Sequence, residues 1–285
     1  MVDVTDYKCD REIAWCPGCG NFGILNAIPR ALAKIGKAPH EVVIVSGIGQ
    51  APKLPHYLNV NTFNGLHGRS LPAATAIKLA NHDLTVIVVG GDGDGYAEGG
   101  NHFLHALRRN IDITYLVHNN QIYGLTKGQA SPTTEPEYIT GTTPWGVLTE
   151  PFNPLVMAIS ADISFVARSF SGAGDHLVDT IAEAITQRGF SFVDILQPCV
   201  SFNHLNTHSW YRERVTPIEG HDPTDRRAAW ELAHKWGDEI PIGVIYKGSR
   251  PAYDSLVPAI RDTPLVKQAR FEDKLPMLNE EFMAR

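Results

Sequence analysis

Apolar residues recur at helical spacing near the start of the chain. The positions between 21 and 36 that follow the period of an amphipathic helix are Ile24, Leu25, Ile28, Leu32 and Ile35. Gly36 is a typical helix stop, and the run VVIVS at 42–46 follows it. This run is continuously apolar and rich in β-branched residues, which is the pattern of a strand buried on both faces.

The same alternation of patterns continues along the chain. The sequence predicts further helices at 69–81, up to about 109 and at 175–188, and further strands at 84–90, 113–118, 164–169 and 191–197. Strands that alternate with helices at this spacing predict an α/β fold with a doubly wound, mostly parallel sheet. Ligands bind such sheets at the carboxyl ends of the strands, so we expect the loops after 46, 90, 118 and 197 on one rim.

The regular pattern weakens after residue 201. We expect an irregular crossing loop over 202–226, a short helix at 225–235 and one more strand at 240–248. The tail from 249 is polar and punctuated by proline, which is typical of a segment that lies on a partner surface. This predicts three parts, which are an N-terminal segment 1–20, an α/β domain 21–200 and an irregular C-terminal extension 201–285 packed on the main domain and a partner subunit.

Composition narrows the class of protein. The net charge of −6 provides no basic field for nucleic acid or anionic lipid. The chain shows no signal core and no run of about 18 apolar residues, so we expect a soluble cytoplasmic protein without a membrane partner. Four cysteines are too few for a disulfide scaffold, which leaves a redox dithiol or a metal site for the CPGC motif at 16–19.

Two polar motifs come directly after neighbouring predicted strands. Gly91-Asp92-Gly93 follows one strand, and Asn119-Asn120 follows the next. Glycines let the backbone approach a diphosphate, but the Asp92 carboxylate would repel it unless a hard cation stood between them. Asp92, Asn120 and the Ile122 carbonyl would provide three oxygen ligands to Mg²⁺. The pattern therefore predicts a magnesium-diphosphate site. A plain glycine turn and a Rossmann dinucleotide site are the alternatives, and the latter would need an acidic residue where this strand ends in HNN.

The spacing of GDG and NN is similar to the signature of thiamine diphosphate enzymes. A longer series of motifs resembles the β subunit of 2-oxoacid:ferredoxin oxidoreductases, in the 2-oxoglutarate and broad 2-oxoacid branch: WCPGCGNFGIL, SGIG, GLHGR, GDGDGYAEGGNHFLHALRRN, NNQIYGLTKGQASPT and LQPC. The resemblance implies a sheet of the thiamine diphosphate-binding type. It also implies CoA-dependent oxidative decarboxylation of a 2-oxoacid, or the reverse reaction, with electrons passing through one [4Fe–4S] cluster to ferredoxin.

The resemblance also implies roles for individual residues. Thiamine diphosphate would lie against Ile48, Gly49, His67, Gly68, Gly91, Asp92, Gly93, Asp94, Asn120, Ile122, Tyr123, Gly124, Leu125 and Thr126. Leu125 would wedge the cofactor into its bent form. Lys53 and Lys127 are candidate cations that would bind substrate carboxylates. Together with Leu125, they are the predicted catalytic residues.

The cysteines match the cluster ligands of this family in part. Cys16, Cys19 and Cys199 match its CxxC and QPC cysteines, but Gln50 stands where the family usually has a further cysteine directly after SGIG. Thiolates hold such clusters in sets of four, and the remaining cysteine is Cys9. We expect Cys9 as the fourth ligand, with Gln50, a histidine or water as alternatives.

The resemblance implies that this chain holds half of an active site. In thiamine enzymes a glutamate on a facing domain bonds the aminopyrimidine ring, and we expect that domain on a partner α subunit in an (αβ)₂ heterotetramer. Ferredoxin, coenzyme A and a 2-oxoacid are the other expected partners. Lys127 favours 2-oxoglutarate, whose second carboxylate needs a cation.

Two other classes of protein share some of these features. A non-redox thiamine diphosphate decarboxylase subunit would keep GDG and NN, but its cysteines would bind zinc or nothing. A non-enzymatic α/β domain stapled by zinc would hold the metal with four thiolates. Iron and sulfide content separates the decarboxylase subunit from the oxidoreductase. A rise in melting point with thiamine diphosphate and Mg²⁺ would exclude the non-enzymatic zinc domain.

Overall fold

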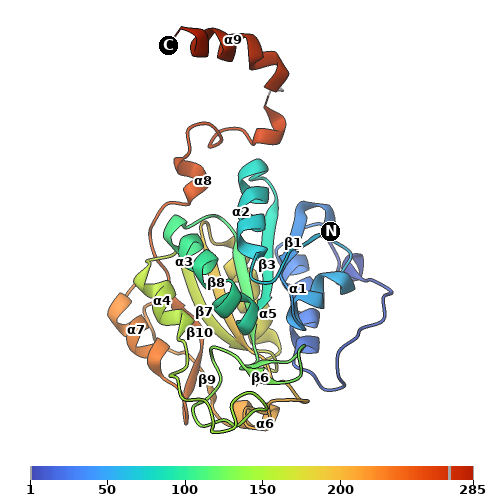
Figure 1. Cartoon of the computed structure of the whole chain (residues 1–285), viewed down its shortest axis with the longest axis vertical. Coiled ribbons are helices and arrows are strands. Elements are labelled where there is room, and N and C mark those ends of the chain that lie inside the picture. The colour runs from blue at the N-terminus through green and yellow to red at the C-terminus, as the bar shows by residue number, and fades with distance from the viewer. Residues whose placement is uncertain (1, 269–270, 285) are drawn as a thin grey trace.

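Eight strands form one sheet in the order β2-β1-β3-β4-β8-β7-β10-β9 (Figure 1). The computed structural model describes residues 2–268 and 271–284. The strands of this sheet are β1 Val42–Ser46, β2 Asn61–Asn64, β3 Thr85–Gly91, β4 Thr114–Asn119, β7 Phe165–Phe170, β8 Ser191–Leu196, β9 Val215–Pro217 and β10 Ile240–Tyr246. A separate two-stranded hairpin joins β5 Ile122–Tyr123 to β6 Gln129–Ala130.

Helices cover both faces of the sheet. The α-helices are α1 Asn21–Lys34, α2 Ser70–Ala80, α3 Gly100–Arg109, α4 Pro154–Ser160, α5 Asp175–Thr186, α6 His208–Arg212, α7 Arg226–His234, α8 Tyr253–Leu256 and α9 Phe271–Met283. Short 3₁₀ turns are η1 Val4–Tyr7, η2 Pro39–Glu41, η3 Ala51–Tyr57 and η5 Leu265–Lys267, and η4 Gly93–Glu98 is a π-helical turn. Helices α1 and α5 form one layer, and α2, α3, α4 and α7 form the other.

Alternate residues of each central strand pack on opposite faces. In β1, Val43 and Val45 pack in the core that contains α2 and α3, whereas Val42 and Ile44 pack with α1 and α5. All four side chains are buried. The continuous apolar runs therefore predicted these strands correctly, because a parallel sheet covered on both faces needs apolar residues at every position.

The central strands run parallel and end at one rim. Ser46 of β1 pairs with Val89 of β3, Gly91 pairs with His118 of β4, and Asn119 pairs with Leu196 of β8. The loops after these strands therefore meet at the carboxyl edge, as expected from the sequence, and the predicted mostly parallel α/β fold is confirmed.

Some elements differ from the sequence-based expectation. Strand β2 was not predicted, because its residues are exposed at the edge of the sheet and lack an apolar pattern. The region after residue 201 is more regular than expected. There β10 pairs antiparallel with β7 and parallel with β9, so this region extends the same sheet.

The last part of the chain begins on the main domain and ends away from it. The Arg250 guanidinium donates to the carbonyl oxygens of Ala161 and Arg108, both at 2.6 Å. Beyond it, α9 stands apart from the sheet (Figure 1) and is a helix where the polar tail predicted irregular structure. Residues 1, 269–270 and 285 of the expected terminal segments lie outside the described residues. No described helix is long and apolar enough to span a membrane.

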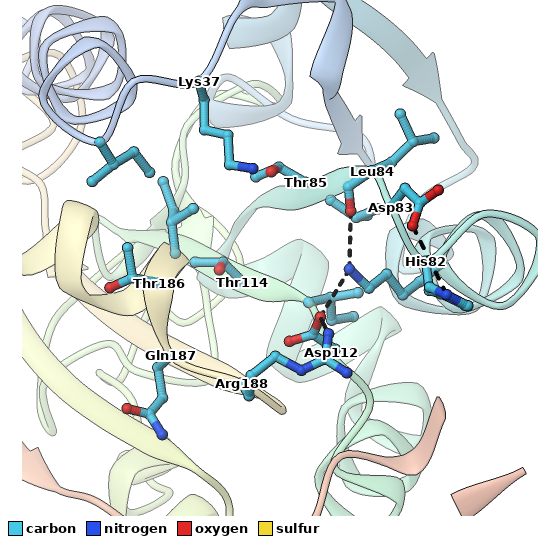
Figure 2. Close-up of a pocket in the computed structure, with 15 residues that line it drawn as sticks. Lys37, His82, Asp83, Leu84, Thr85, Asp112, Thr114, Thr186, Gln187 and Arg188 are labelled. Carbon is cyan, nitrogen blue, oxygen red and sulfur yellow. Dashed lines mark hydrogen bonds and ion pairs between the residues drawn. The ribbon is translucent and has the colours of Figure 1, made fainter. Parts of the chain in front are cut away.

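A cavity of about 290 Å³ lies at the amino ends of β3 and β4, at the edge opposite the rim (Figure 2). Several of its charged groups form ion pairs. Lys78 Nζ lies 2.8 Å and Arg188 Nη1 lies 2.6 Å from Asp112 Oδ2, and Arg188 Nη2 lies 2.7 Å from Asp254 Oδ2. These ion pairs tie α2 to the turn before β4 and to the C-terminal segment, so we assign this cavity a structural role.

We expect Lys78→Met to lower the free energy of unfolding by about 3 kcal/mol, because it leaves a largely buried carboxylate without one of its two cations. Chemical denaturation of the purified protein measures this change. Lys34→Met is the matched control, since Lys34 pairs with Asp179 at an exposed site and should change stability by less than about 1 kcal/mol. Equal effects of the two substitutions would contradict a structural role for the buried pair.

Candidate active site

A cleft opens at the rim, between the ends of β1, β3 and β4. Its lining is Ile48, Gly49, Gln50, Ala51, His67, Gly91, Asp92, Gly93, Asp94, Asn120, Ile122, Tyr123, Gly124, Leu125 and Thr126. Thirteen of the fourteen residues assigned to thiamine diphosphate from the sequence are in this set. The exception is Gly68, whose backbone N–H bonds to Asp94 instead. The topology thus gathers residues from four loops that are far apart in the sequence.

Asp92 is a buried carboxylate that forms no ion pair with the described residues. It is 1% exposed, and burial raises its pKa to about 6 against the weaker effect of hydrogen bonds from neighbouring groups. Asn120 N–H lies 3.4 Å from Oδ1, and the Thr133 hydroxyl lies 3.0 Å from Oδ2. Burying an ionised carboxylate among neutral donors is costly unless a cation joins it. Asp92 therefore fits the role of a metal ligand.

Asn120 is held in place by groups on both sides of it. Its Oδ1 accepts a 3.1 Å bond from Ile122 N–H, and its Nδ2 donates to Gln197 Oε1 at 3.2 Å. The Asn203 amide donates to its backbone carbonyl at 3.1 Å. These bonds fix the orientation of the side-chain oxygen beside Asp92, and they leave that oxygen with a second lone pair for a cation.

Asp94 joins two loops of the cleft. Its Oδ1 accepts hydrogen bonds from Ile48 N–H at 3.0 Å and Gly68 N–H at 2.7 Å, and His67 Nδ1 lies 3.1 Å from the same oxygen. Burial raises the pKa of this carboxyl group. A Cβ at Gly47 would lie 2.1 Å from Asp94 Oδ2, so glycine is required there. Asp94, predicted to bind the cofactor, therefore also organises the loops that surround it.

A tight turn brings the backbone into the cleft after β3. Gly93 begins the π-helical turn η4, and a Cβ at this position would lie 2.3 Å from the Tyr123 ring. Gly68 has a φ of +71°, and a Cβ there would lie 2.4 Å from the carbonyl carbon of Glu98. Both glycines allow chain segments to approach more closely than a side chain permits. π-Helical turns are frequent at functional sites.

A second pocket adjoins the cleft. Its lining contains the sulfur-bearing residues Cys16, Cys19 and Cys199, and it shares Gln50, Asn120 and Gly124 with the cleft. Burial, helped by the nearby Cys199 and Cys16, raises the pKa of Cys19 to about 11, whereas hydrogen bonds from Asn21 and Gln197 act in the opposite direction. No three His, Cys, Asp or Glu side chains of the described residues converge on one point as for a single metal ion.

The sulfur atoms receive hydrogen bonds from the protein. Ser201 Oγ donates to Cys16 Sγ at 3.1 Å, and Gln197 Nε2 donates to Cys19 Sγ at 3.5 Å. Such donors stabilise sulfur that carries negative charge and tune iron–sulfur clusters. The three matching cysteines therefore fit a cluster site. Cys9 does not line this pocket, and its Sγ lies 3.6 Å from the His56 carbonyl oxygen.

Several residues that support the two pockets were missed in the sequence. Gln197 is fully buried and links Asn120 to Cys19, and Thr133 bonds Asp92 or Asn119. A signal was present for Gln197, which precedes Pro198-Cys199 directly after a strand, just as Asp92 and Asn120 follow theirs. Thr133 lies in a loop without periodicity, so nothing in the sequence singled it out.

One catalytic candidate lines the cleft, and the other two lie in segments next to its lining. Leu125 lines it and is 41% exposed. Lys127 is exposed in the turn between β5 and β6, with a φ of +78°, and Lys53 is half-buried in η3. Neither lysine lines the cleft itself. Their contact with a substrate carboxylate stays a prediction.

The fold and the cleft define a thiamine-binding domain, and comparison with known proteins agrees. The family described as "Thiamine pyrophosphate enzyme, C-terminal TPP binding domain" matches residues 34–195. The family described as the C-terminal part of the "Pyruvate ferredoxin oxidoreductase beta subunit" matches residues 199–262.

Relatives narrow this class. The β subunit of 2-oxoacid:ferredoxin oxidoreductase 1 of Aeropyrum pernix is 43% identical over 85% of this chain and 80% of its own length. The 2-oxoglutarate oxidoreductase subunit KorB of Mycobacterium tuberculosis is 46% identical over 70% of this chain and 53% of its own. The structure of a 2-oxoglutarate:ferredoxin oxidoreductase from Magnetococcus marinus, with 2-oxoglutarate, coenzyme A and succinyl-CoA bound, covers 97% of this chain and 95% of its own at 40% identity, with a TM-score of 0.90. The chain belongs to the β subunits of 2-oxoacid:ferredoxin oxidoreductases, which confirms the family inferred from the sequence.

We expect Asp94→Ala to lower the free energy of unfolding by about 3 kcal/mol, because it leaves the Ile48 and Gly68 N–H groups without their shared acceptor. Chemical denaturation measures this loss, and calorimetry should show weaker binding of thiamine diphosphate because both loops line the cleft. Asp94→Asn is the control, since its amide oxygen can accept the same two bonds. A loss of equal size in Asp94→Asn would mean that the charge matters and not the two hydrogen bonds.

Proposed function

We propose that this chain, with a partner α subunit, catalyses the thiamine- and CoA-dependent oxidative decarboxylation of 2-oxoglutarate, or the reverse reaction, and passes electrons through one [4Fe–4S] cluster to ferredoxin. The observation that carries this proposal is the wall shared by the two pockets. Gln50, Asn120 and Gly124 line both the cleft with the metal ligands and the pocket with the cysteines. A two-electron oxidation that must release electrons singly needs its carbon centre beside an electron acceptor.

The cleft would hold thiamine diphosphate and Mg²⁺ through a small set of groups. Asp92 and Asn120 would bind the cation through side-chain oxygens, and Ile122 would add its backbone carbonyl. The close approach at Gly93 would bring backbone N–H groups to the diphosphate. Thiamine diphosphate, when bound, supplies the carbanion that attacks the keto carbon. Leu125, at the mouth, would support the bent form of the cofactor.

The neighbouring pocket would hold the cluster through Cys16, Cys19 and Cys199. Ser201 and Gln197 would donate hydrogen bonds to two of the three sulfurs. These bonds would stabilise the extra negative charge of the reduced cluster and so raise its reduction potential. Gln197 also bonds Asn120, so one buried side chain would orient groups of both cofactor sites. A displacement of the groups at one site would therefore displace groups at the other.

The relatives support the choice of substrate. Several carry names that specify 2-oxoglutarate, and the Magnetococcus marinus structure contains 2-oxoglutarate, coenzyme A and succinyl-CoA. 2-Oxoglutarate has a second carboxylate, which requires a cation when it leaves water. Lys127, which follows the lining residue Thr126, or Lys53, two residues after the lining residue Ala51, would provide that charge.

The size of the cleft supports a partner subunit. It encloses about 70 Å³, whereas ligand pockets usually hold about 300–1,000 Å³. Another surface must cover much of the cofactor and the substrate. We assign this surface to the α subunit, in an (αβ)₂ assembly, and expect the C-terminal segment from 249 to contribute to the contact.

The decisive experiment is anaerobic purification of the α and β subunits together. We expect about four irons and four sulfides per β subunit and reduction of ferredoxin that requires 2-oxoglutarate, coenzyme A and thiamine diphosphate. Zinc in place of iron, or carbon dioxide release without ferredoxin reduction, would instead favour a non-redox thiamine decarboxylase subunit.

We expect Asp92→Asn to abolish the stabilisation of the complex by thiamine diphosphate plus Mg²⁺, because an amide is a much weaker ligand for a hard cation. In the wild type, cofactor at 100 times its dissociation constant should stabilise by about 2.7 kcal/mol. A thermal-shift titration measures the difference. Asp179→Asn, at an exposed site on α5, is the matched control and should respond as the wild type does. An unchanged response in Asp92→Asn would remove Asp92 from the metal site.

We expect Lys127→Met to raise the KM for 2-oxoglutarate by about tenfold or more and to change the KM for pyruvate by less than about twofold, because only the dicarboxylate uses the extra cation. Steady-state ferredoxin reduction with each oxoacid measures both constants. Lys53→Met tests the second candidate, and Lys37→Met, beside the cavity at the opposite edge of the sheet, is the control. Equal changes for both oxoacids would show that Lys127 does not select the substrate.

A further inference from the structure

Gln50 lies between the two pockets, and its side-chain oxygen accepts no hydrogen bond from the described residues. Its side chain lines both the cleft and the cysteine pocket. Its Oε1 is buried, and no donor among the described residues bonds to it. A Cβ built at Gly124 would lie 3.6 Å from Cys199 Sγ and 3.8 Å from Gln50 Cγ, so Gln50 and Cys199 face the same small space. A buried acceptor without a partner is costly, and a metal bound in this small space would satisfy it.

Cys9 contacts the end of η3 that is far from Gln50. Gln50 caps the start of η3, whereas Cys9 Sγ contacts the carbonyl oxygen of His56 near its end. Six residues of 3₁₀ helix, from Gln50 to His56, span about 12 Å at 2 Å per residue. Cys9 therefore lies far beyond the length of a metal–thiolate bond, about 2.3 Å, from the position of Gln50.

The Trp15 side chain fills the space along this helix. Its Nε1 donates to the Gln50 carbonyl at 2.9 Å, and its ring packs 4.9 Å from the Tyr57 ring. Cys9 would have to leave His56 and pass this buried indole to reach the other cysteines. The structure therefore separates Cys9 from the pocket that it was expected to complete.

We propose that three thiolates, from Cys16, Cys19 and Cys199, hold the cluster, and that the Gln50 amide oxygen occupies the fourth corner on the side of the thiamine cleft. This inference rests on the proposed function, since it concerns the cluster assigned there. It replaces the expected role of Cys9. The corner nearest the thiamine cleft then carries a neutral oxygen ligand instead of a thiolate.

Two properties follow from a neutral fourth ligand. Removing one thiolate lowers the negative charge around the iron, which raises the reduction potential and makes the cluster a better electron acceptor. The iron at this corner is also held more weakly. A one-electron oxidant such as ferricyanide should take one electron from [4Fe–4S]²⁺ and release one Fe²⁺, which leaves [3Fe–4S]⁺ bound to the three cysteines.

The experiment uses the anaerobically purified αβ complex as the wild type and as four variants. Iron and sulfide analysis with EPR spectroscopy before and after ferricyanide follows the cluster, and a redox titration gives its potential. We expect the wild type and Cys9→Ser to lose one of about four irons and to show the EPR signal of an oxidised [3Fe–4S] cluster. Gln50→Cys should keep all its irons under the same treatment and have a lower reduction potential. Cys19→Ser should lose most of the cluster.

The outcomes distinguish the inference from the proposed function. A large loss of iron in Cys9→Ser before oxidation would make Cys9 a ligand and overturn the inference, while the function proposed above would stand. Resistance of the wild type to ferricyanide, with no effect of Gln50→Cys on the potential, would also overturn it. Absence of iron and sulfide from the wild-type complex would instead overturn the proposed function. Gln50→Ser, which keeps no amide oxygen, separates a ligand role from a misfolded Gln50→Cys protein, because it should lose iron faster than the wild type.

Discussion

The active site depends on one row of hydrogen bonds across the ends of three parallel strands. Asp92, Asn120 and Gln197 come directly after β3, β4 and β8, which are neighbours in the sheet. The Asn120 backbone bonds Asp92, and the Asn120 side chain bonds Gln197. Because parallel pairing aligns the strand ends, three residues that are far apart in the sequence occupy adjacent positions. The proposed metal ligands Asp92 and Asn120 belong to this row, and Gln197 connects it to the cysteine pocket.

The row also explains why the two pockets adjoin. Gln197 continues through Pro198 to Cys199, and its amide reaches Cys19, so the last member of the row brings the cysteine pocket against the wall of the cleft. Below it, the buried Asp194 of β8 accepts a 2.8 Å bond from the Tyr96 hydroxyl of the π-helical turn. The turn that holds Gly93 is thereby tied to the strand that leads to Cys199. Supporting hydrogen bonds of this kind hold the side chains of a site in a fixed geometry.

The open side of the cleft has the opposite character. Two apolar side chains of its loops are exposed: Leu125, which lines the cleft, at 41%, and Leu66, which precedes the lining residue His67, at 76%. Exposed apolar surface beside polar residues is typical of a surface that another protein covers. Buried hydrogen bonds within the β subunit hold the closed side of the cleft, and the proposed α subunit would cover the open side. This division would explain why one chain combines rigidly held candidate metal ligands with a small, open cleft.

Local patterns along the chain were enough to predict the central sheet and the rim of the site. Continuous apolar runs fixed the central strands, because a sheet buried on both faces admits few polar residues, and GDG and NN marked the rim because they directly follow such runs. The tertiary structure decided what depends on contacts between distant segments. It showed that Asp94 joins two loops, that Thr133 and Gln197 support the site, and that β2 and β9 complete the sheet without an apolar pattern. It also placed Gln50, and not Cys9, beside the three cysteines. Spacing along the chain made Cys9 a candidate, but the fold of η3 and the packing of Trp15 set its distance in space, and no local pattern encodes that distance.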